Sequence, residues 1–296
     1  MKLKTNEKRL VKIAVEGKPA PALAYPNEIG SDGKIHNIPS VGGITFNVLV
    51  GDPAFGWAAD HIEPCVSTVH NAEKRKERPN VAFNFLTCIG NEAVIIGGKM
   101  AGKKGVVTGH HGGVEHVIID FPKDVFEKMS LDDKIQIRTF GQGLCLEDFP
   151  EITLSSLDPE LLHKMSPKSL GKKLEVEVAK IVPAKLTGSG MGSTHSKSGD
   201  IDLISSDKNL LEQNDLLDLK LGDIVAIADC DASFGWCHRG GAITVAVVIH
   251  GDSHLSGHGP GMATIMTSSI GAIIPKKSKD ANIGRYLKIG RYRKIK

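Results

Sequence analysis

The sequence predicts a mainly β protein: short-stranded β barrels or a sandwich with a few short helices, in two β-rich parts. The 296 residues include 33 glycines and 14 prolines, more than a helical bundle carries. Valine and isoleucine are frequent whereas aromatic residues make up only 5%, which is typical of short strands joined by tight turns. A hydrophobic content of 41% is sufficient for a buried core.

Short apolar or alternating runs, bounded by glycine-containing turns, predict the individual strands. Residues 242–250, AITVAVVIH, are apolar on both faces, so this strand is expected to be central and buried. Residues 174–184, LEVEVAKIVPA, alternate cleanly between apolar and charged positions. Further strands are expected at residues 10–17, 44–52, 81–90, 92–98, 105–109, 114–121, 131–141 and 223–229.

A change of composition near residues 150–172 divides the chain into an N-terminal β-rich domain (1–155) and a C-terminal β-rich domain (170–275). Between them, Asp158 followed by Pro159 predicts the N-cap and first position of a short helix. A second short helix is expected within residues 206–223.

A basic tail (276–296) follows the second domain and holds nine Lys or Arg residues but one Asp. It suits a solvated or subunit-docked extension better than a nucleic-acid arm, because the body of the chain has no basic stripe. Since strand edges need cover, a homo-oligomer is expected.

The chain lacks the features of a membrane or secreted protein. No run approaches the roughly 20 apolar residues of a membrane helix, and no secretory signal is recognisable. The five cysteines are scattered and form no CxxC pair, so neither a disulfide framework nor a structural zinc ribbon is indicated. We expect a cytoplasmic location.

One hexapeptide occurs twice: Asp52–Trp57 reads DPAFGW and Asp231–Trp236 reads DASFGW. Both copies follow a predicted strand, and they contain the only two tryptophans of the chain. Either the two halves are diverged copies of one β unit, or both loops meet at one place. On the second interpretation Trp57 and Trp236 contact a substrate.

The richest polar segment extends from Asp229 to Gly261. An extended run would place its imidazole and carboxylate groups on one face but up to roughly 26 Å apart, too far for one ion. The intervening glycines can bend the chain and bring a subset together. Such ligands suit zinc, iron or manganese, although polar loops of this kind often only satisfy backbone groups. The predicted metal ligands are Asp231, His250, Asp252, His254 and His258.

A glycine- and serine-rich loop at residues 188–202 can cradle an anion through its backbone N–H groups, or it is a flexible surface loop. It contains neither a Walker motif nor a dinucleotide fingerprint, so no nucleotide cofactor is expected. Asp200 and Asp202 begin a strand and face the same way. The loop is expected to contribute Ser189, Ser193 and Thr194 to substrate binding and His195 to catalysis.

Two further motifs suit metal binding or acid–base chemistry. One is Asp60-His61-x-Glu63, directly after the first hexapeptide, and the other contains His110, His111 and His116. Each also fits an ordinary structural role. Asp60 and His61 are the catalytic candidates of the first half, and Asp52 is a further ligand candidate there.

Three segments carry a family resemblance: GSGMGSTHSKSGDIDL, GDIVAIADCDASFGW and AITVAVVIHGDSHLSGHGPGMATIMTS. With them the chain resembles the bacterial domain-of-unknown-function family numbered 4438, over most of its length. The resemblance implies a two-part β-rich protein and no assigned activity.

The polar segments together predict a metal-assisted hydrolase of a small polar or amide substrate. The alternative is a non-catalytic small-ligand-binding or homo-oligomeric assembly protein, in which the histidines are structural.

Overall fold

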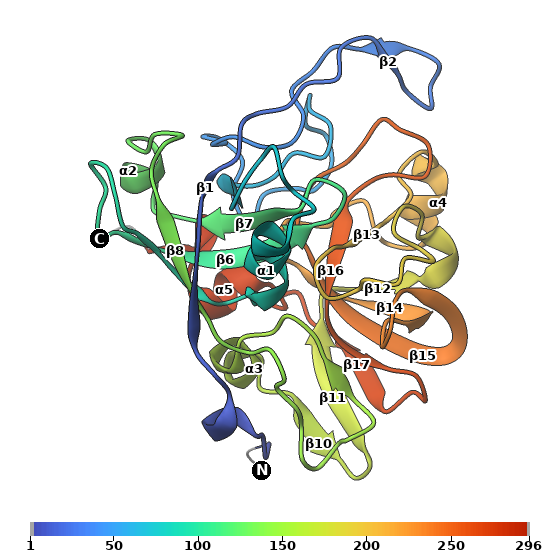
Figure 1. The fold of residues 1–296 in the computed structure, drawn as a ribbon. Helices are drawn as coiled ribbons and strands as arrows, with labels where there is room; N and C mark the ends of the chain where they lie inside the picture. Colours follow the sequence, from blue (N-terminus) through green and yellow to red (C-terminus); the bar gives the residue numbers. More distant parts are fainter. Residues whose placement is uncertain (1–2, 295–296) are drawn as a thin grey trace.

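The computed structural model describes residues 3–294 and is mainly β, with a closed barrel and separate sheets (Figure 1). The predicted fold class is confirmed. The barrel belongs to the first half of the chain, and its strands run in the order β1-β4-β7-β6-β5-β8. The strand bounds are β1 (Ile13–Pro19), β4 (Val66–Val69), β5 (Glu92–Ile95), β6 (Lys104–His111), β7 (His116–Asp120) and β8 (Ile135–Thr139).

Alternation explains how the barrel buries its interior. In β8, Ile135 and Ile137 are buried while Arg138 is exposed, as expected when successive side chains point to opposite faces. Phe83 of helix α1 (Arg78–Leu86) joins the same apolar cluster.

The main sheet of the second half has the order β12-β14-β15-β16-β13. The predicted central strand is confirmed, since β15 pairs with both β14 and β16 and is buried from Val245 to Val248. β9, from the first half, adds to the sheet beside β16. The bounds are β9 (Thr153–Leu154), β12 (Lys180–Pro183), β13 (Ile201–Asp202), β14 (Ile224–Asp231), β15 (Cys237–Val248) and β16 (Gly261–Ser268).

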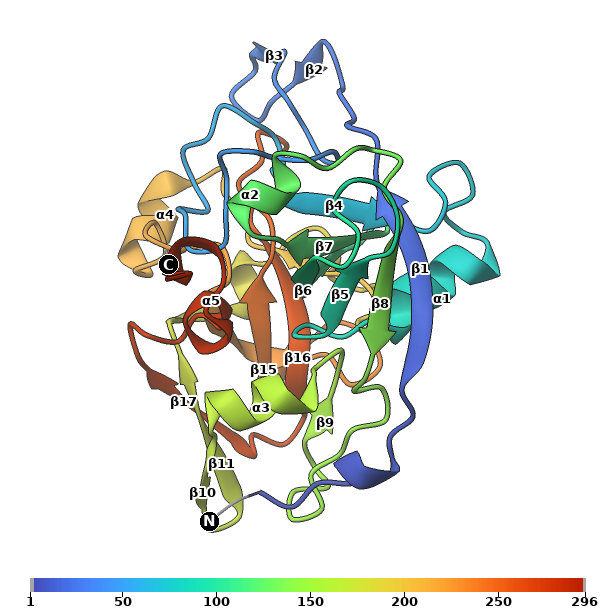
Figure 2. The ribbon, with the colours of Figure 1, turned by 90° about the vertical axis from the view of Figure 1, so that its left-hand side faces the viewer.

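Two smaller sheets complete the β structure. In one, β10 (Lys168–Leu170) pairs with β11 (Lys173–Val178), which runs parallel to β17 (Ile273–Lys277). The other is a hairpin of β2 (Glu28–Ile29) and β3 (Ile35–His36), which stands at the opposite end of the molecule from β10 (Figure 2).

The remaining elements are short helices. Asp158 caps helix α3 by accepting a hydrogen bond from the Glu160 N–H, and Pro159 is its first residue, as predicted. Asp207 caps α4, which confirms the second predicted helix. The helices are α2 (Lys123–Phe126), α3 (Pro159–Met165), α4 (Lys208–Gln213), α5 (Ile283–Leu287) and three 3-10 turns, at Glu7–Arg9, Ala184–Leu186 and Gly290–Tyr292.

Two strand predictions are wrong. Most of residues 81–90 lies in or directly after α1, because Pro79 favours a helix start and Phe83 packs onto the barrel. Residues 44–52 form only an isolated bridge at Ile44. The reason is a turn in which Asp52 accepts a hydrogen bond from the Leu49 N–H.

The two halves share a core. One apolar cluster contains Ile89, Ile118 and Leu157 from the first half together with Val245 and Ile265 from the second. The chain passes between the halves through β9 and α3. The division into domains 1–155 and 170–275 stays a prediction.

The described part of the basic tail packs against the body. It includes the end of β17 and α5, and its arginines form ion pairs: Arg291 with Asp52, at 2.6 Å between Nε and Oδ1, and Arg293 with buried Asp120. These two cations are therefore engaged within the chain. Within residues 3–294, no helix has the length and apolar character needed to cross a membrane.

Candidate metal centre

Four polar segments that are distant in sequence meet where the barrel contacts the second sheet. They are the loop containing His61, the β6–β7 hairpin with His111, the start of β13 with Asp200 and Asp202, and the loop that joins β15 to β16. The loop after β15 bends back, so that His250 and His258 both contact Asp202. The bend that the glycines predicted is present.

The outer triad consists of His61, Asp202 and His258, whose ligand atoms lie within 4.8 Å of one another. Asp202 Oδ2 lies 3.0 Å from His258 Nδ1 and 3.7 Å from His61 Nε2. His61 has a φ of 50°, in the left-handed region that non-glycine residues rarely adopt. Backbone strain of this kind is commonly retained at functional sites.

The inner triad consists of His111, Asp200 and His250, and its ligand atoms also lie within 4.8 Å of one another. His250 Nε2 lies 2.9 Å from Asp200 Oδ2. The His250 side chain is fully buried, and its ring stacks on that of His111 with centroids 4.1 Å apart. A Cβ at position 261 would collide with both Asp200 and His250, so the centre requires Gly261.

Asp202 connects the two triads. Its Oδ2 faces His61 and His258, whereas its Oδ1 lies 3.6 Å from His250 Nε2. One carboxylate therefore presents a different oxygen to each triad. An ion in either triad would face one oxygen of this carboxylate.

Buried acceptors fix the orientation of three of the four imidazoles. Asp60 Oδ2 lies 2.5 Å from His61 Nδ1, and Glu63 Oε1 lies 2.7 Å from His111 Nδ1. The backbone carbonyl of Gly251 lies 2.9 Å from His250 Nδ1. When Nδ1–H donates to such an acceptor, Nε2 is left as the free lone-pair ligand.

The buried carboxylates and imidazoles of the centre shift one another's pKa values. Burial raises the pKa of Asp202, but hydrogen bonds with His250, His258 and His61 outweigh it and hold that pKa well below the usual range. Burial lowers the pKa of His250, but Asp200 and Asp202 raise it well above the ordinary value. Burial likewise opposes the low pKa of Glu63, which His116 and His111 maintain.

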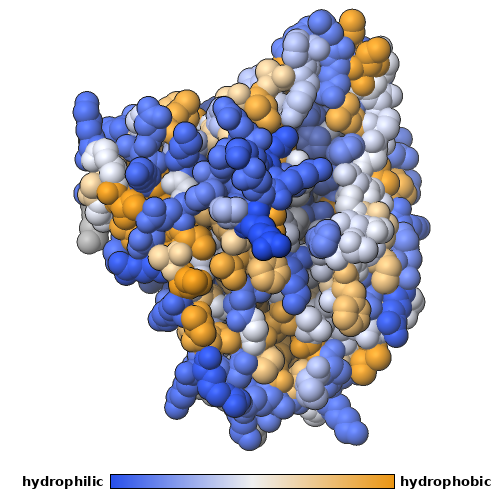
Figure 3. All heavy atoms as spheres, viewed as in Figure 1, coloured by the Kyte–Doolittle hydropathy of each residue, from blue (hydrophilic) through white to orange (hydrophobic). Residues whose placement is uncertain are grey.

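A cavity of about 700 Å³ covers the centre. All three outer-triad residues line it, as do His111 and Asp200. On the face of the molecule that carries α1, hydrophilic residues gather in the upper middle of the view (Figure 3). A second cavity, of about 210 Å³, reaches His61 and His111 from the side of Tyr25 and Glu28.

Three predicted ligands lie outside both triads. Asp231 contacts Ser233 and Arg239, and Asp252 accepts from Lys208 Nζ at 2.8 Å. Even spacing does not place these residues on one face, because β15 ends at Val248 and the alternation of an extended strand does not continue into the loop.

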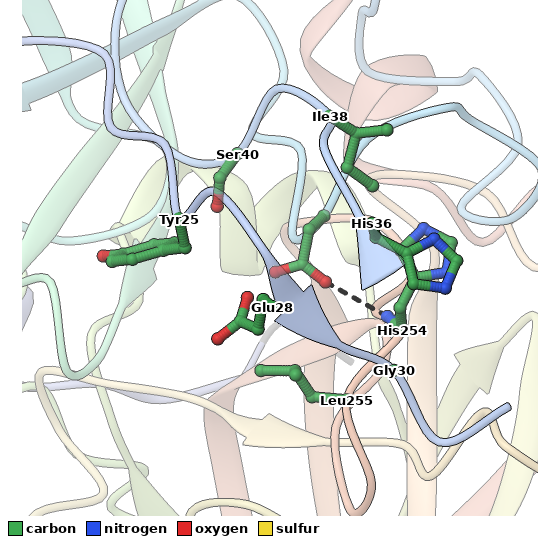
Figure 4. A pocket seen from close by; sticks show the side chains of 9 residues that line it. Tyr25, Glu28, Gly30, His36, Ile38, Ser40, His254 and Leu255 are labelled. Carbon is green, nitrogen blue, oxygen red and sulfur yellow. Dashed lines mark hydrogen bonds between the residues drawn. The ribbon is translucent and has the colours of Figure 1, made fainter. Parts of the chain in front are cut away.

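His254, the third, lies beside the β2–β3 hairpin. Its ring stacks on that of His36 with centroids 4.0 Å apart (Figure 4), and the backbone N–H of His254 donates to Asp60 Oδ1. It lines the small pocket drawn there, together with Tyr25 and Glu28.

The predicted substrate contacts divide between two cavities. Trp236 is buried, donates from Nε1 to Thr264 Oγ1 and lines the cavity over the triads. Trp57 instead lines a separate cavity of about 590 Å³. The two hexapeptide loops therefore do not share one hollow. Ser189, Ser193 and His195 line the cavity over the triads, whereas Thr194 is not among its lining residues.

Sequence reasoning did not select His111, Asp200 or Asp202 as ligands, although it marked the motifs that contain them. The spacing Asp200-Ile-Asp202 could have indicated two of these ligands, because two carboxylates on the same face of one strand can each bind one ion. Asp52, the further candidate, is held by Arg291 instead.

Comparisons with known proteins agree with this architecture. The family model described as "Domain of unknown function (DUF4438), N-terminal" matches residues 27–163, and its C-terminal counterpart matches residues 164–287. A solved structure titled "Crystal structure of TM1086" is similar to the chain, with a TM-score of 0.90 and 42% identity over 96% of this chain and 99% of that chain. No curated protein matches. The chain thus belongs to the DUF4438 family and contains both its N-terminal and C-terminal parts.

Proposed function

We propose that this protein is a metal-dependent hydrolase of a small polar substrate, with one divalent ion in each triad. The observation that carries the proposal is the sharing of Asp202 between two groups of two histidines and one aspartate. Mixed imidazole and carboxylate ligands suit zinc, iron or manganese.

The orientation of the imidazoles supports metal binding. Metal-ligating histidines usually donate their second ring N–H to a carboxylate or a backbone carbonyl, and Asp60, Glu63 and the Gly251 carbonyl are placed for this role. Because metal binding requires neutral imidazoles, an ion would replace the protons that now balance the carboxylates.

The open side of the centre favours catalysis over a structural role. Structural metal sites are usually closed by four protein ligands, whereas catalytic sites leave a position for water or substrate. The outer triad supplies three ligands, all of which line the large cavity, so a position for water or substrate stays open there. A bound divalent ion would supply a water of lowered pKa and polarise a carbonyl group.

The roles of the predicted catalytic residues follow from their places. His61 is a ligand in this proposal and Asp60 orients it. His195 is exposed and lines the cavity, where it can exchange protons with a bound substrate. Ser189, Ser193 and Trp236 line the same cavity and would contact the substrate.

Metal stoichiometry tests the proposal. Protein stripped with a chelator and reloaded with zinc, manganese or ferrous iron should bind two ions per chain by elemental analysis and calorimetry. Asp202→Asn should lose both ions, because it removes a ligand of the outer triad and the carboxylate oxygen that faces the inner triad. Asp231→Asn, which changes a buried aspartate outside the triads, is the matched control and should keep both.

Less than one ion per wild-type chain would contradict the proposal. Equal ion contents in the Asp202→Asn and Asp231→Asn variants would contradict it as well. Melting temperatures of both variants show whether a loss of ions reflects a loss of fold.

The second candidate is a non-catalytic, homo-oligomeric binding protein. One observation favours assembly: Ile29 and Ile35 face each other across the β2–β3 hairpin and are 65% and 60% exposed. Adjacent exposed apolar side chains on a projecting hairpin suit contact with a second copy. Light scattering should then show an oligomer in the wild type and a monomer in Ile29→Ser/Ile35→Ser, with metal content unchanged.

A cytoplasmic location is part of the proposal. All five cysteines are free, and three of them are buried. Free thiols are the usual state in a reducing compartment.

A further inference from the structure

Two of the side chains that line the large cavity carry positive charge. Arg75 and Lys76, in the segment before α1, both line this cavity. Arg75 is half-buried, and its Nη1 lies 3.4 Å from the Gly113 carbonyl. Lys76 is exposed, and the salt bridges recorded for residues 3–294 include neither side chain. These cations are available to a molecule in the cavity.

The side-chain nitrogen of a buried amide in the cavity lining has no hydrogen-bond partner within residues 3–294. Asn84 of α1 lines the cavity and is 1% exposed. Its Oδ1 lies 3.1 Å from His110 Nδ1, while its Nδ2 has no partner among the described residues. Because a buried donor without an acceptor is costly, an acceptor from a ligand would stabilise it.

The charge of the lining depends on the metal ions. The lining contains two cationic side chains, Arg75 and Lys76, and three carboxylates, Glu115, Asp200 and Asp202. With the imidazoles neutral, as metal binding requires, one divalent ion reverses this excess of one negative charge, and a second makes the lining strongly positive. Positive lining in a cleft attracts anions.

We propose that the metal-loaded cavity binds a small molecule carrying a carboxylate or phosphate group. In this proposal an oxygen of the molecule contacts the ions, Arg75 and Lys76 contact its anionic group, and Asn84 Nδ2 donates to a further oxygen. This inference rests on the proposed metal centre and specifies its substrate class. A cavity of about 700 Å³ is within the size range of small-molecule sites.

The test measures the binding of defined probes to zinc-loaded protein by calorimetry. Malonate and inorganic phosphate distinguish the two anion classes, and malonamide is the neutral counterpart of malonate. We expect at least one of the anions to bind at least about tenfold more tightly than malonamide, as charge-assisted hydrogen bonds predict.

Two sets of variants locate the interaction. Arg75→Gln/Lys76→Gln should weaken binding of the anion at least about tenfold. Lys74→Gln/Arg78→Gln makes the same change of charge at neighbouring exposed positions that do not line the cavity and should weaken it by no more than about twofold. Asn84→Asp places a carboxylate where the amide donates and should also weaken anion binding; its melting temperature reports on folding.

The outcomes separate the two proposals. If zinc binds at two ions per chain but anion affinity is equal in the two double variants, the substrate class is wrong and the metal centre stands. Equal affinities for malonate, phosphate and malonamide overturn the substrate class in the same way. If no zinc binds, both proposals are overturned.

Discussion

The outer and inner triads have the same composition but differ in burial. The His250 side chain of the inner triad is fully buried, whereas His258 of the outer triad is 34% exposed. All three outer ligands line the large cavity, but His250 does not. An ion in the inner triad would thus be shielded, while one in the outer triad could exchange water and meet substrate. We therefore expect hydrolysis of the substrate to take place at the outer ion.

The largest expected difference between the triads concerns the stability of metal-free protein. His250→Ala should lower the free energy of unfolding by about 3–5 kcal/mol, because it leaves Asp200 and Asp202 buried without their cationic partner. His258→Ala should lower it by less than about 1 kcal/mol, since that side chain is partly solvated. Urea denaturation in the presence of a chelator measures both. Equal losses of unfolding free energy in the two variants would contradict the difference in burial between the triads.

The rates at which bound metal ions are released should also differ between the two triads. With two zinc ions bound, a chelator should remove the outer ion at least about tenfold faster than the inner one, because the inner ion requires local opening of the structure. His258→Ala should abolish the fast phase and keep the slow one. A single rate for both ions in the wild type would contradict the comparison.

Asp120, a buried carboxylate outside both triads, serves as a reference. Removing its cationic partner should change the free energy of unfolding less than His250→Ala does. Burial raises the pKa of Asp120 to about 6, against the opposing effect of Arg293. Since this folded pKa exceeds the ordinary value of 3.8, charged Asp120 destabilises the fold fully above pH 6, and this effect fades as the pH falls from 6 towards 3.8. Arg293→Gln should cost about 1 kcal/mol at pH 7.5, because Arg293 is partly exposed.

The reference behaves differently from the triads in two respects. Because Asp120 protonates in acid, the stability loss of Arg293→Gln should shrink at pH 5. It should also be the same with and without zinc, since neither residue belongs to a triad. Urea denaturation at the two pH values checks this, and a loss that grows in acid would refute the assignment.

Local sequence signals predicted much of the fold because their causes are local. Alternation in Leu174–Val178 and the apolar run ending at Val248 fix strands, and Asp158 with Pro159 fixes a helix start. Helix α1 was missed because its apolar residues form a run that also suits a strand; Pro79 at the helix start and the packing of Phe83 on the barrel favour the helix. Tertiary context overrides local preference there.

The candidate centre was predictable in its parts but not in its assembly. The motifs containing His61, His111 and Asp202 were each recognisable as polar segments, yet they meet only through the topology. His61 and His258 are 197 positions apart and 3.1 Å apart between Nε2 and Nδ1. No periodicity connects such residues, which is why His254 could not be separated from His258 by spacing alone.

Anomalous diffraction from zinc-loaded crystals tests the central claim most directly. The account predicts two zinc peaks on either side of the Asp202 carboxylate, about 3.5–4 Å apart, one bound by His61 and His258 and the other by His111, Asp200 and His250. Crystals grown in excess zinc that show no anomalous peak at these six residues would contradict it.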